Sequence, residues 1–403
     1  MKNVFYEMDN FIKHNPFELG EMCMKKTLKV LAVADPAVLG YVDKNYEIIT
    51  KFNGDFNVDF NIVPFAEYYP EMIEAFEGKK EYDVVMVAGH LWLKDFVDKK
   101  YLAHVDKNYS EDYDYNDILT VIREELKIDG VQYLYPSFCD GHVVLYRKSV
   151  VEKVLGKLPD KVISTDELIE MAKKCHGYNN MNGIVLKAHE SEIFLDFLPY
   201  LRNEGVDAID EVTHTPTFNN EKGVKALEKY ISLKEFAPSN TNEFGNDEVR
   251  IAFQNKECVF AATWGGQLGV VLGEGCLDVE DIGFAALKTS WNVTWSFGIN
   301  ALSKLKKEAN EFLRYITSKE VDRVIGAYAG SPVRKSTYVE DMDKYNWYEM
   351  HLDLIENYAK PLPQILKAGD KFGVLYGAIS KAFNGKNSIK EALKEAEEQI
   401  SKI

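Results

Sequence analysis

Residues 129–148 carry the side chains whose chemistry is most evident in this sequence. Between two short apolar strands they place an aromatic ring, Phe138, a carboxylate, Asp140, and an imidazole, His142. A ring covers the apolar face of a polyhydroxylated ligand, and a carboxylate accepts two hydroxyl hydrogen bonds. The segment therefore suits a sugar-binding loop. The alternative is a hairpin whose aromatic residues only fill the core, and this segment alone leaves both interpretations open.

Tryptophan residues gather near predicted strand ends. Trp264 follows a predicted strand and precedes Gly265, which places it at a carboxyl end, where open α/β sheets bind their ligands. Trp92 lies just past another strand, and Trp291 and Trp295 flank a loop. Each ring by itself is more often a core residue. Together they favour a cleft lined by aromatic rings.

One candidate nucleophile is present, Cys139, three residues before His142. A reactive thiolate needs a positioned base, and in an extended segment an offset of three places the side chains on opposite faces. No separate acid or base stands out, so we expect a buried structural thiol and no catalytic residue.

Metal and cofactor motifs are weak. The histidines are dispersed, without HxxxH or HExxH spacing. Residues 106–117 place oxygens at EF-hand-like offsets, but Glu111 stands where the central glycine belongs and Asp117 where a glutamate belongs. The glycines of segment 265–275 form neither a Walker loop nor GxGxxG. We expect a solvated loop at 106–117, and neither a metal nor a cofactor.

The composition limits the classes of partner. A chain of 403 residues is too long for one typical core, so two lobes are expected. A formal net charge of −16 argues against nucleic acid, anionic membranes and polyanionic ligands, because these require clustered Lys and Arg.

The N-terminal segment is charged and has no signal-peptide core or lipoprotein cleavage box, and no run of about 18 apolar residues exists. The five cysteines are scattered, which is typical of reduced thiols. We therefore expect a cytoplasmic location if residue 1 is the natural start.

The first part of the chain alternates strands and helices. We expect strands at 28–34, 56–63 and 82–88, with helices at 37–52 and at 70–78 between them. Strict alternation of apolar and polar residues places 56–63 towards a sheet edge, whereas the fully apolar 82–88 belongs in a covered parallel sheet. This βαβαβ order predicts right-handed crossovers.

The remainder also alternates, without an internal repeat or a flexible linker, and predicts a second α/β lobe joined to the first by short crossing strands. The expected strands are 183–187, 257–263, 282–287 and 295–301, and the expected helices are 164–174, 193–203, 220–233, 306–317, 319–328 and a final amphipathic helix that begins at Ser388.

From about residue 27 to 403 the chain resembles the family 1 extracellular solute-binding proteins, the carbohydrate-binding components of ABC importers. The resemblance is carried by segments in the order of that family, namely LKVLAVAD, YDVVMVAGHLWLKDFVDKKYLAHVD, DGVQYLYPSFCDGHVVLYRKSVVEKV, STDELIEMAKK, FNNEKGVKALEKY, VRIAFQNKECVFAATWGG, SFGINALSKLKKEANEFLRYITSKE and GSPVRKS.

The resemblance implies an α/β, two-lobed periplasmic-binding-protein-like fold of type II, with hinged lobes that each hold a mixed, mostly parallel sheet. It implies non-catalytic binding of an oligosaccharide in the interlobe cleft by a monomer that works with permease subunits if exported. The expected limits are an appendage at 1–25, an N-lobe at 26–140 plus about 297–330, and a C-lobe at 141–296 plus about 331–403.

Carried over residue by residue, the family's ligand contacts fall on Asp140, Trp264, Trp295 and Arg334, with looser matches at His90, Trp92 and Phe138, and His142 stands in the same segment. The two tryptophans would stack on sugar faces. The carboxylate and the guanidinium would pair with hydroxyls.

The sequence departs from the family in two ways. Family members are exported and tethered to lipid, which leaves importer and intracellular sugar sensor as alternative roles. Thiaminase I shares the fold and has a catalytic cysteine in the loop that holds Cys139 here, which makes a transferase the alternative function. The thiaminase cysteine position, however, aligns with Asp140, and its general base has no counterpart beside Trp264.

Overall fold

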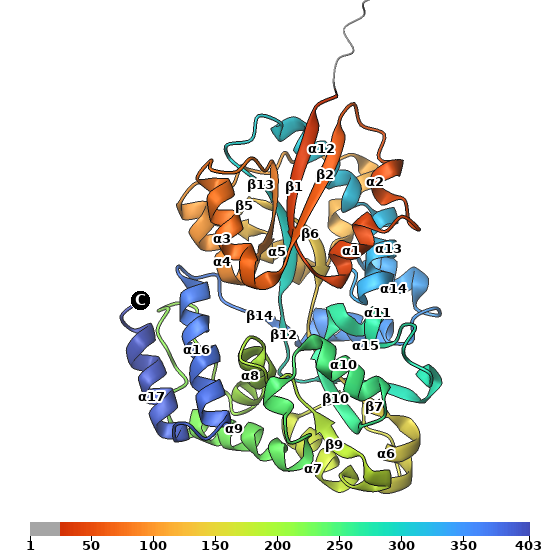
Figure 1. The fold of residues 1–403 in the computed structure, drawn as a ribbon, viewed down its shortest axis with the longest axis vertical. Coiled ribbons are helices and arrows are strands. Elements are labelled where there is room, and N and C mark those ends of the chain that lie inside the picture. Colours follow the sequence, from red (N-terminus) through yellow and green to blue (C-terminus); the bar gives the residue numbers. More distant parts are fainter. Residues whose placement is uncertain (1–24) are drawn as a thin grey trace, which may run out of the picture.

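The computed structural model describes residues 25–403 and folds them into two lobes, which lie one above the other in Figure 1. Residues 1–24 of the predicted appendage lie outside the described part. The N-lobe is built on a five-stranded sheet of order β2-β1-β3-β13-β6, and the C-lobe on a five-stranded sheet of order β8-β11-β7-β10-β9. The predicted two-lobed α/β fold with mixed sheets is confirmed.

The N-lobe sheet contains β1 (Thr27–Val33), β2 (Asn57–Val63), β3 (Val84–Ala88), β6 (Leu134–Cys139) and β13 (Thr294–Ile299). β1 pairs in parallel with β2 and β3, whereas β13 runs against both β3 and β6. The alternating β2 lies at the edge as predicted, and the apolar β3 is buried along its whole length.

The C-lobe sheet contains β7 (His142–Arg147), β8 (Val162–Ile163), β9 (Asn182–Val185), β10 (Cys258–Trp264) and β11 (Ile282–Leu287). Here β7 runs against both of its neighbours, β10 and β11. In each sheet the single reversed strand has crossed from the other lobe, since β7 directly follows β6, and β13 follows β11 through β12 (Trp291–Asn292). β12 pairs with β14 (Lys360–Pro361). These crossings place the lobe junction around residues 140–141 and 288–293.

The aromatic segment at 129–148 is not a hairpin, because its two strands belong to different sheets. β6 passes through Pro136 and continues to Cys139, so it includes Phe138, which was expected in the loop between the strands. Proline is tolerated there because β6 is an edge strand, where a missing N–H donor costs little. Phe138 and His142 consequently lie in strands, and only Asp140 and Gly141 separate β6 from β7.

The N-lobe helices cover both faces of its sheet. They are α1 (Pro36–Val42), α2 (Ile48–Lys51), α3 (Phe65–Phe76), α4 (Gly89–Asp98), α5 (Thr120–Glu125), α12 (Lys306–Ile316) and α13 (Lys319–Ala329). The helix predicted at 37–52 is wrong as one element, because residues 43–47 interrupt it and Glu47 adopts a left-handed conformation with φ of 56°. Pro70 does not begin a helix but lies inside α3, which loses one backbone hydrogen bond there.

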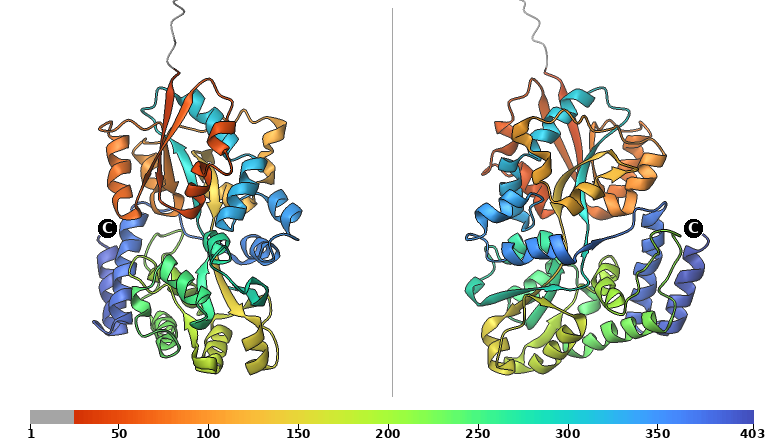
Figure 2. Two further views of the ribbon diagram at one scale, coloured as in Figure 1. Left: turned by 45° about the vertical axis from the view of Figure 1, so that its right-hand side comes forward. Right: turned by 180° about the vertical axis from the view of Figure 1, so that it is seen from behind.

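The other helices belong to the C-lobe and to the junction. They are α6 (Lys148–Leu155), α7 (Thr165–Cys175), α8 (Ile193–Asn203), α9 (Glu221–Ser232), α10 (Asn246–Gln254), α11 (Leu268–Val271), α14 (Lys335–Asp341), α15 (Tyr348–Asp353), α16 (Ala368–Phe383) and α17 (Ile389–Ile400). Both predicted capping boxes form, at Ser164 and at Ser388. Both views of Figure 2 place α16 and α17 along one side of the C-lobe. Across residues 25–403 no helix combines the length and apolar character that a membrane span requires.

Candidate ligand-binding site

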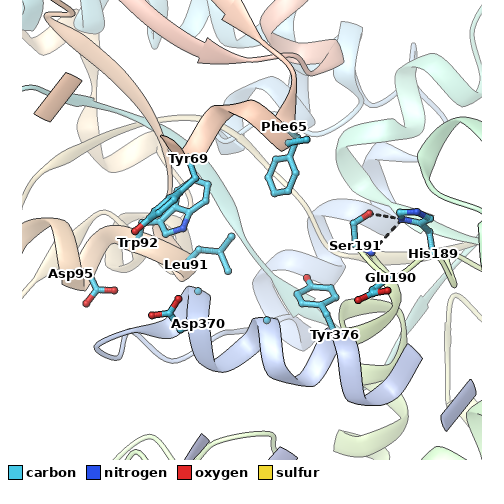
Figure 3. Close-up of a pocket in the computed structure, with 13 residues that line it drawn as sticks. Phe65, Tyr69, Leu91, Trp92, Asp95, His189, Glu190, Ser191, Asp370 and Tyr376 are labelled. Atoms are coloured by element: carbon cyan, nitrogen blue, oxygen red, sulfur yellow. Dashed lines mark hydrogen bonds between the residues drawn. The ribbon is translucent and has the colours of Figure 1, made fainter. Parts of the chain in front are cut away.

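A cleft with two adjoining compartments lies between the lobes. The inner chamber has a volume of about 250 Å³ and the outer mouth a volume of about 660 Å³. Phe65, Leu91, Ser191 and Tyr376 line both compartments, so the two are continuous. Figure 3 shows the mouth, with the rings of the N-lobe on one side and α16 with Tyr376 on the other.

Strand ends supply most of the inner chamber. Asp35 follows β1 and His90 follows β3, and these parallel strands bring their carboxyl ends together. From the C-lobe, Trp264 is the last residue of β10, and Gln267 lies in the turn after it. The site therefore occupies the carboxyl ends of strands in both sheets, as expected for open α/β sheets.

Asp140 lies at the lobe junction and lines the inner chamber. Its Oδ1 accepts a hydrogen bond from the Gly266 backbone N–H at 2.8 Å, and its own N–H donates to the Val293 carbonyl at 2.9 Å. Burial raises the pKa of Asp140 to about 6. Within residues 25–403 its Oδ2 accepts no hydrogen bond, so one oxygen holds the loop and the other remains for a ligand.

Two further carboxylates, which were not predicted, line the same chamber. Asp35 caps α1 through Oδ1, which accepts from the Ala37 N–H at 2.9 Å, and burial raises its pKa to about 7. Glu192 accepts from the Trp264 Nε1–H through Oε2 at 3.0 Å, and burial raises its pKa although Lys187 opposes the shift. Like Asp140, each is anchored through one oxygen and has a second oxygen without a hydrogen-bond donor among the described residues.

Trp264 lines the chamber but is only 5% exposed. The Lys187 ammonium lies 4.1 Å from its ring centroid, over one face, and His142 and Trp291 meet the ring in edge-on contacts at 5.3 and 4.8 Å. One face of the indole is thus already occupied. Its clearest role is to hold Glu192.

Trp295 is partly exposed and lines the inner chamber. Its ring centroid lies 6.4 Å from that of Phe65 and 6.1 Å from that of Trp92, and Trp92 in turn lies 5.6 Å from Tyr69. Phe65 and Tyr69 are themselves exposed, at 53% and 43%. These four rings form an aromatic wall that runs from the chamber into the mouth.

His90 lines the chamber, as the sequence suggested. Burial lowers its pKa to about 3, so the imidazole is neutral near pH 7, and its Nδ1 is buried without a hydrogen-bond partner among the described residues. His142, in contrast, lies behind the chamber wall, where its Nε2 is 2.7 Å from Asp196 Oδ1. Phe138 is also fully covered and packs beside Gly266.

Arg334 is not brought to the cleft. It is fully buried against the N-lobe, where Nε and Nη2 donate to the Thr317 carbonyl at 3.1 and 2.8 Å and Nη1 donates to the Asp114 carbonyl at 3.0 Å. Its guanidinium also lies 4.7 Å from the Tyr113 ring centroid. A guanidinium engaged in this way stabilises the packing of the lobe and has no donor directed at the cleft.

Residues 34–323 match the family model described as bacterial extracellular solute-binding protein. The chain belongs to this family. A probable ABC transporter-binding protein of Deinococcus radiodurans is 25% identical over 298 residues, which cover 68% of this chain and 70% of the relative. The mannitol-binding protein of Pseudomonas aeruginosa is 26% identical over 246 residues, covering 57% and 56%, and the erythritol/L-threitol-binding protein of Mycolicibacterium smegmatis is 24% identical over 355 residues, covering 77% and 71%.

Solved structures share the fold of this solute-binding protein. Maltose-bound MalE3 of T. maritima superposes with a TM-score of 0.82 at 20% identity and covers 93% of this chain and 99% of its own. An ABC transporter solute-binding protein of Agrobacterium vitis with bound D-mannitol has a TM-score of 0.81 at 22% identity, with 94% and 98% coverage.

The thiol of this solute-binding protein at Cys139 is fully buried and lines neither compartment. Its Sγ lies 3.4 Å from the Pro332 carbonyl oxygen and 3.8 Å from the Tyr338 hydroxyl, and burial raises its pKa far above the usual range. The thiolate is therefore strongly disfavoured, which is the opposite of what a nucleophile requires.

Two sequence motifs also have structural explanations. A Cβ at Gly265 would overlap the His351 ring, and a Cβ at Gly266 would approach Asp140 Oδ1, so this glycine pair permits close packing. In the loop at 106–117, Asp114 pairs with Lys319 at 2.8 Å, as expected for a solvated loop.

Proposed function

We propose that this solute-binding protein binds a carbohydrate, an oligosaccharide, in the interlobe cleft for ABC-type uptake, and that it catalyses no reaction. The observation that carries the proposal is the arrangement of the inner chamber. Asp35, Asp140 and Glu192 are each fixed through one oxygen and each have a second one free beside the aromatic wall.

Free carboxylate oxygens and aromatic rings are complementary to a sugar. A carboxylate accepts hydroxyl hydrogen bonds, which are stronger than those between neutral groups, and a ring packs on the apolar C–H face. The mannitol-binding and erythritol/L-threitol-binding relatives and the maltose-bound structural neighbour support polyhydroxylated ligands as a class.

The two compartments indicate the length of the ligand. The inner chamber of about 250 Å³ fits a terminal unit, and the mouth of about 660 Å³ continues the aromatic wall past it. A ligand of more than one unit uses both, so affinity should rise from monosaccharide to disaccharide.

Calorimetric titration tests this proposal. Purified protein is titrated with monosaccharides, alditols and their di- and trisaccharide counterparts, and the best ligand is then tested against Asp140→Asn. We expect this variant to weaken binding at least about tenfold, because a neutral amide replaces a charged acceptor. Asp59→Asn, on the exposed face of β2, makes the same change outside the cleft and should bind normally. If no sugar or alditol binds at millimolar concentration, the proposal is wrong.

The absence of catalysis is tested through Cys139. Cys139→Ala should bind sugar as the wild type does, because the thiol is covered and faces Pro332 and Tyr338. If the wild type converts thiamine and Cys139→Ala does not, the binding proposal is wrong and the transferase alternative replaces it.

We propose further that the protein delivers its ligand to importer subunits, which the ABC transporter-binding relative supports, and that it does so as a monomer. Light scattering after size exclusion should give a monomer mass with and without sugar, and a stable dimer would contradict it.

A further inference from the structure

The cleft has an unbalanced charge. Among the described residues, the lining of its two compartments includes six carboxylate side chains and no lysine or arginine. The six are Asp35, Asp140 and Glu192 in the chamber and Asp95, Glu190 and Asp370 in the mouth. A neutral sugar requires only hydroxyl acceptors, and it does nothing to offset this charge.

One ammonium group, that of Lys187, lies close enough to interact electrostatically with the three carboxylates of the chamber. Lys187 is fully buried behind Trp264, where its Nζ donates to Asn246 Oδ1 and lies over the indole. Its electrostatic influence reaches Asp35, Asp140 and Glu192 at once. One positive charge does not offset three carboxylates in an enclosed space where charge is poorly screened, and a ligand cation among them would favour their ionised forms.

Gln267 adds hydrogen-bonding groups to the chamber. Its side chain lines the chamber and is only 7% exposed, yet its amide makes no hydrogen bond within residues 25–403. Its amide atoms are not enclosed by protein and remain open to the chamber, where a ligand can bond them. The chamber thus presents a neutral donor and acceptor next to its charged acceptors.

A metal ion is a poor candidate for the missing positive charge. In residues 25–403 no group of three or more His, Cys, Asp or Glu side chains is arranged to hold a metal ion. Each of the three carboxylates also uses one oxygen to accept a hydrogen bond from the protein. An ammonium group needs only single hydrogen bonds from separate acceptors, and it gains from nearby aromatic faces.

We propose that the preferred ligand is an amino sugar, a saccharide whose terminal unit carries a protonated amino group held among Asp35, Asp140 and Glu192 in the inner chamber. This inference rests on the proposed function, because the rest of the ligand is the carbohydrate that the aromatic wall accommodates. The ammonium makes charge-assisted hydrogen bonds with the free oxygens and lies near the Trp295 face. Uronic acids and sugar phosphates are repelled by the same carboxylates.

Matched ligands provide the test. Calorimetry measures the affinity for glucose, galactose, mannose and their β-1,4-linked disaccharides. Each sugar is tested in three forms, which carry a hydroxyl, an ammonium or an acetamido group at the same carbon. We expect the ammonium form of the best-bound sugar to bind at least about tenfold tighter than the other two, which corresponds to about 1.4 kcal/mol. Added salt should weaken the ammonium form more than the neutral ones.

Variants connect the preference to the chamber. Asp35→Asn removes the charge but keeps the cap of α1, since asparagine is an equally good N-cap residue. We expect Asp35→Asn to weaken binding of the ammonium form at least about fivefold more than binding of the neutral form, and we expect the same of Glu192→Gln. Asp59→Asn on β2 should leave the ratio of the two affinities unchanged.

The outcomes separate the two proposals. If the hydroxyl form binds as tightly as the ammonium form, the amino-sugar inference is wrong and the carbohydrate function stands. If no sugar in any form binds, the proposed function itself fails, and the inference fails with it. Putrescine serves as an amine without a sugar ring, and tighter binding of putrescine than of every sugar would overturn both.

Discussion

The Trp264 indole donates its Nε1–H to Glu192 Oε2 over 3.0 Å, so a ring at the end of β10 fixes a carboxylate that immediately precedes α8. Trp264 is also the ring that covers Lys187. The ring of Trp295, on the opposite lobe, contacts the rings of Phe65 and Trp92 and remains partly exposed. We therefore expect two tryptophans with the same predicted role to differ, with Trp264 positioning Glu192 and Trp295 stacking on the ligand.

Truncation of the two rings should therefore have different effects. Trp295→Ala should weaken sugar binding about two- to tenfold, the value of one stacked ring, with little change in melting temperature. Trp264→Ala should weaken binding and also destabilise the fold by about 3–5 kcal/mol, because it removes a buried ring and frees Glu192. Calorimetry and urea unfolding measure both quantities. Tyr46→Ala, an exposed ring outside the cleft, is the control. Equal losses of stability would show that both rings serve the core.

Local pattern was enough to predict most of the elements. Helix α8 and strand β11 have the bounds predicted from the pattern of apolar residues, and both capping boxes form as the residue spacing indicated. The sheet-edge position of β2 followed from strict alternation. In these elements the residues that decide the structure lie within a few positions of one another.

The failures come from contacts between distant residues. The segment that holds β6 and β7 left a hairpin open as an alternative, because pairing partners in two different sheets cannot be recognised from neighbouring residues. Helix α16 was missed because Gly369, Gly373 and Gly377 lower helix propensity. Two of these glycines line the mouth, where a side chain would occupy ligand space.

The candidate site was predictable only in part. Asp140, Trp264, Trp295 and His90 reach the chamber, but Arg334 and His142 are engaged in the lobes. Asp35 and Glu192 were missed because an N-cap aspartate and a glutamate before a helix look ordinary in sequence. They become site residues only when the crossing strands bring the two lobes together.

Asp35 should make folding stability depend on pH. Its pKa is 3.8 in an unfolded chain and about 7 in the fold, raised by burial and by Asp140 and Glu192, with Lys187 and the Ala37 N–H opposing. Between these values the folded state keeps a proton that the unfolded state has released, so this group's contribution to stability is present at low pH and is lost as pH rises towards 7.

Asp35→Asn removes that dependence. The free energy of unfolding of the variant, relative to wild type, should increase by about 1–2 kcal/mol from about pH 4 to about pH 7 and then level off. The increase is small because Asp35 is partly exposed and its charge is partly screened. Urea unfolding at matched pH values measures the difference, and Asp59→Asn provides the baseline. A difference that is flat across this range would mean that Asp35 titrates normally in the fold.

Ligand binding should close the lobes. Asp35 comes from the N-lobe and Glu192 from the C-lobe, so a ligand that bonds both is bound more tightly when the lobes approach, and it shifts the equilibrium by that differential affinity. Small-angle scattering at ligand saturation should give a smaller radius of gyration than the ligand-free protein. Glu192→Gln should require more ligand for the same compaction, and Asp59→Asn should behave as wild type. If calorimetry shows full occupancy and the radius is unchanged, the cleft is already closed, and both lobes contact the ligand without moving.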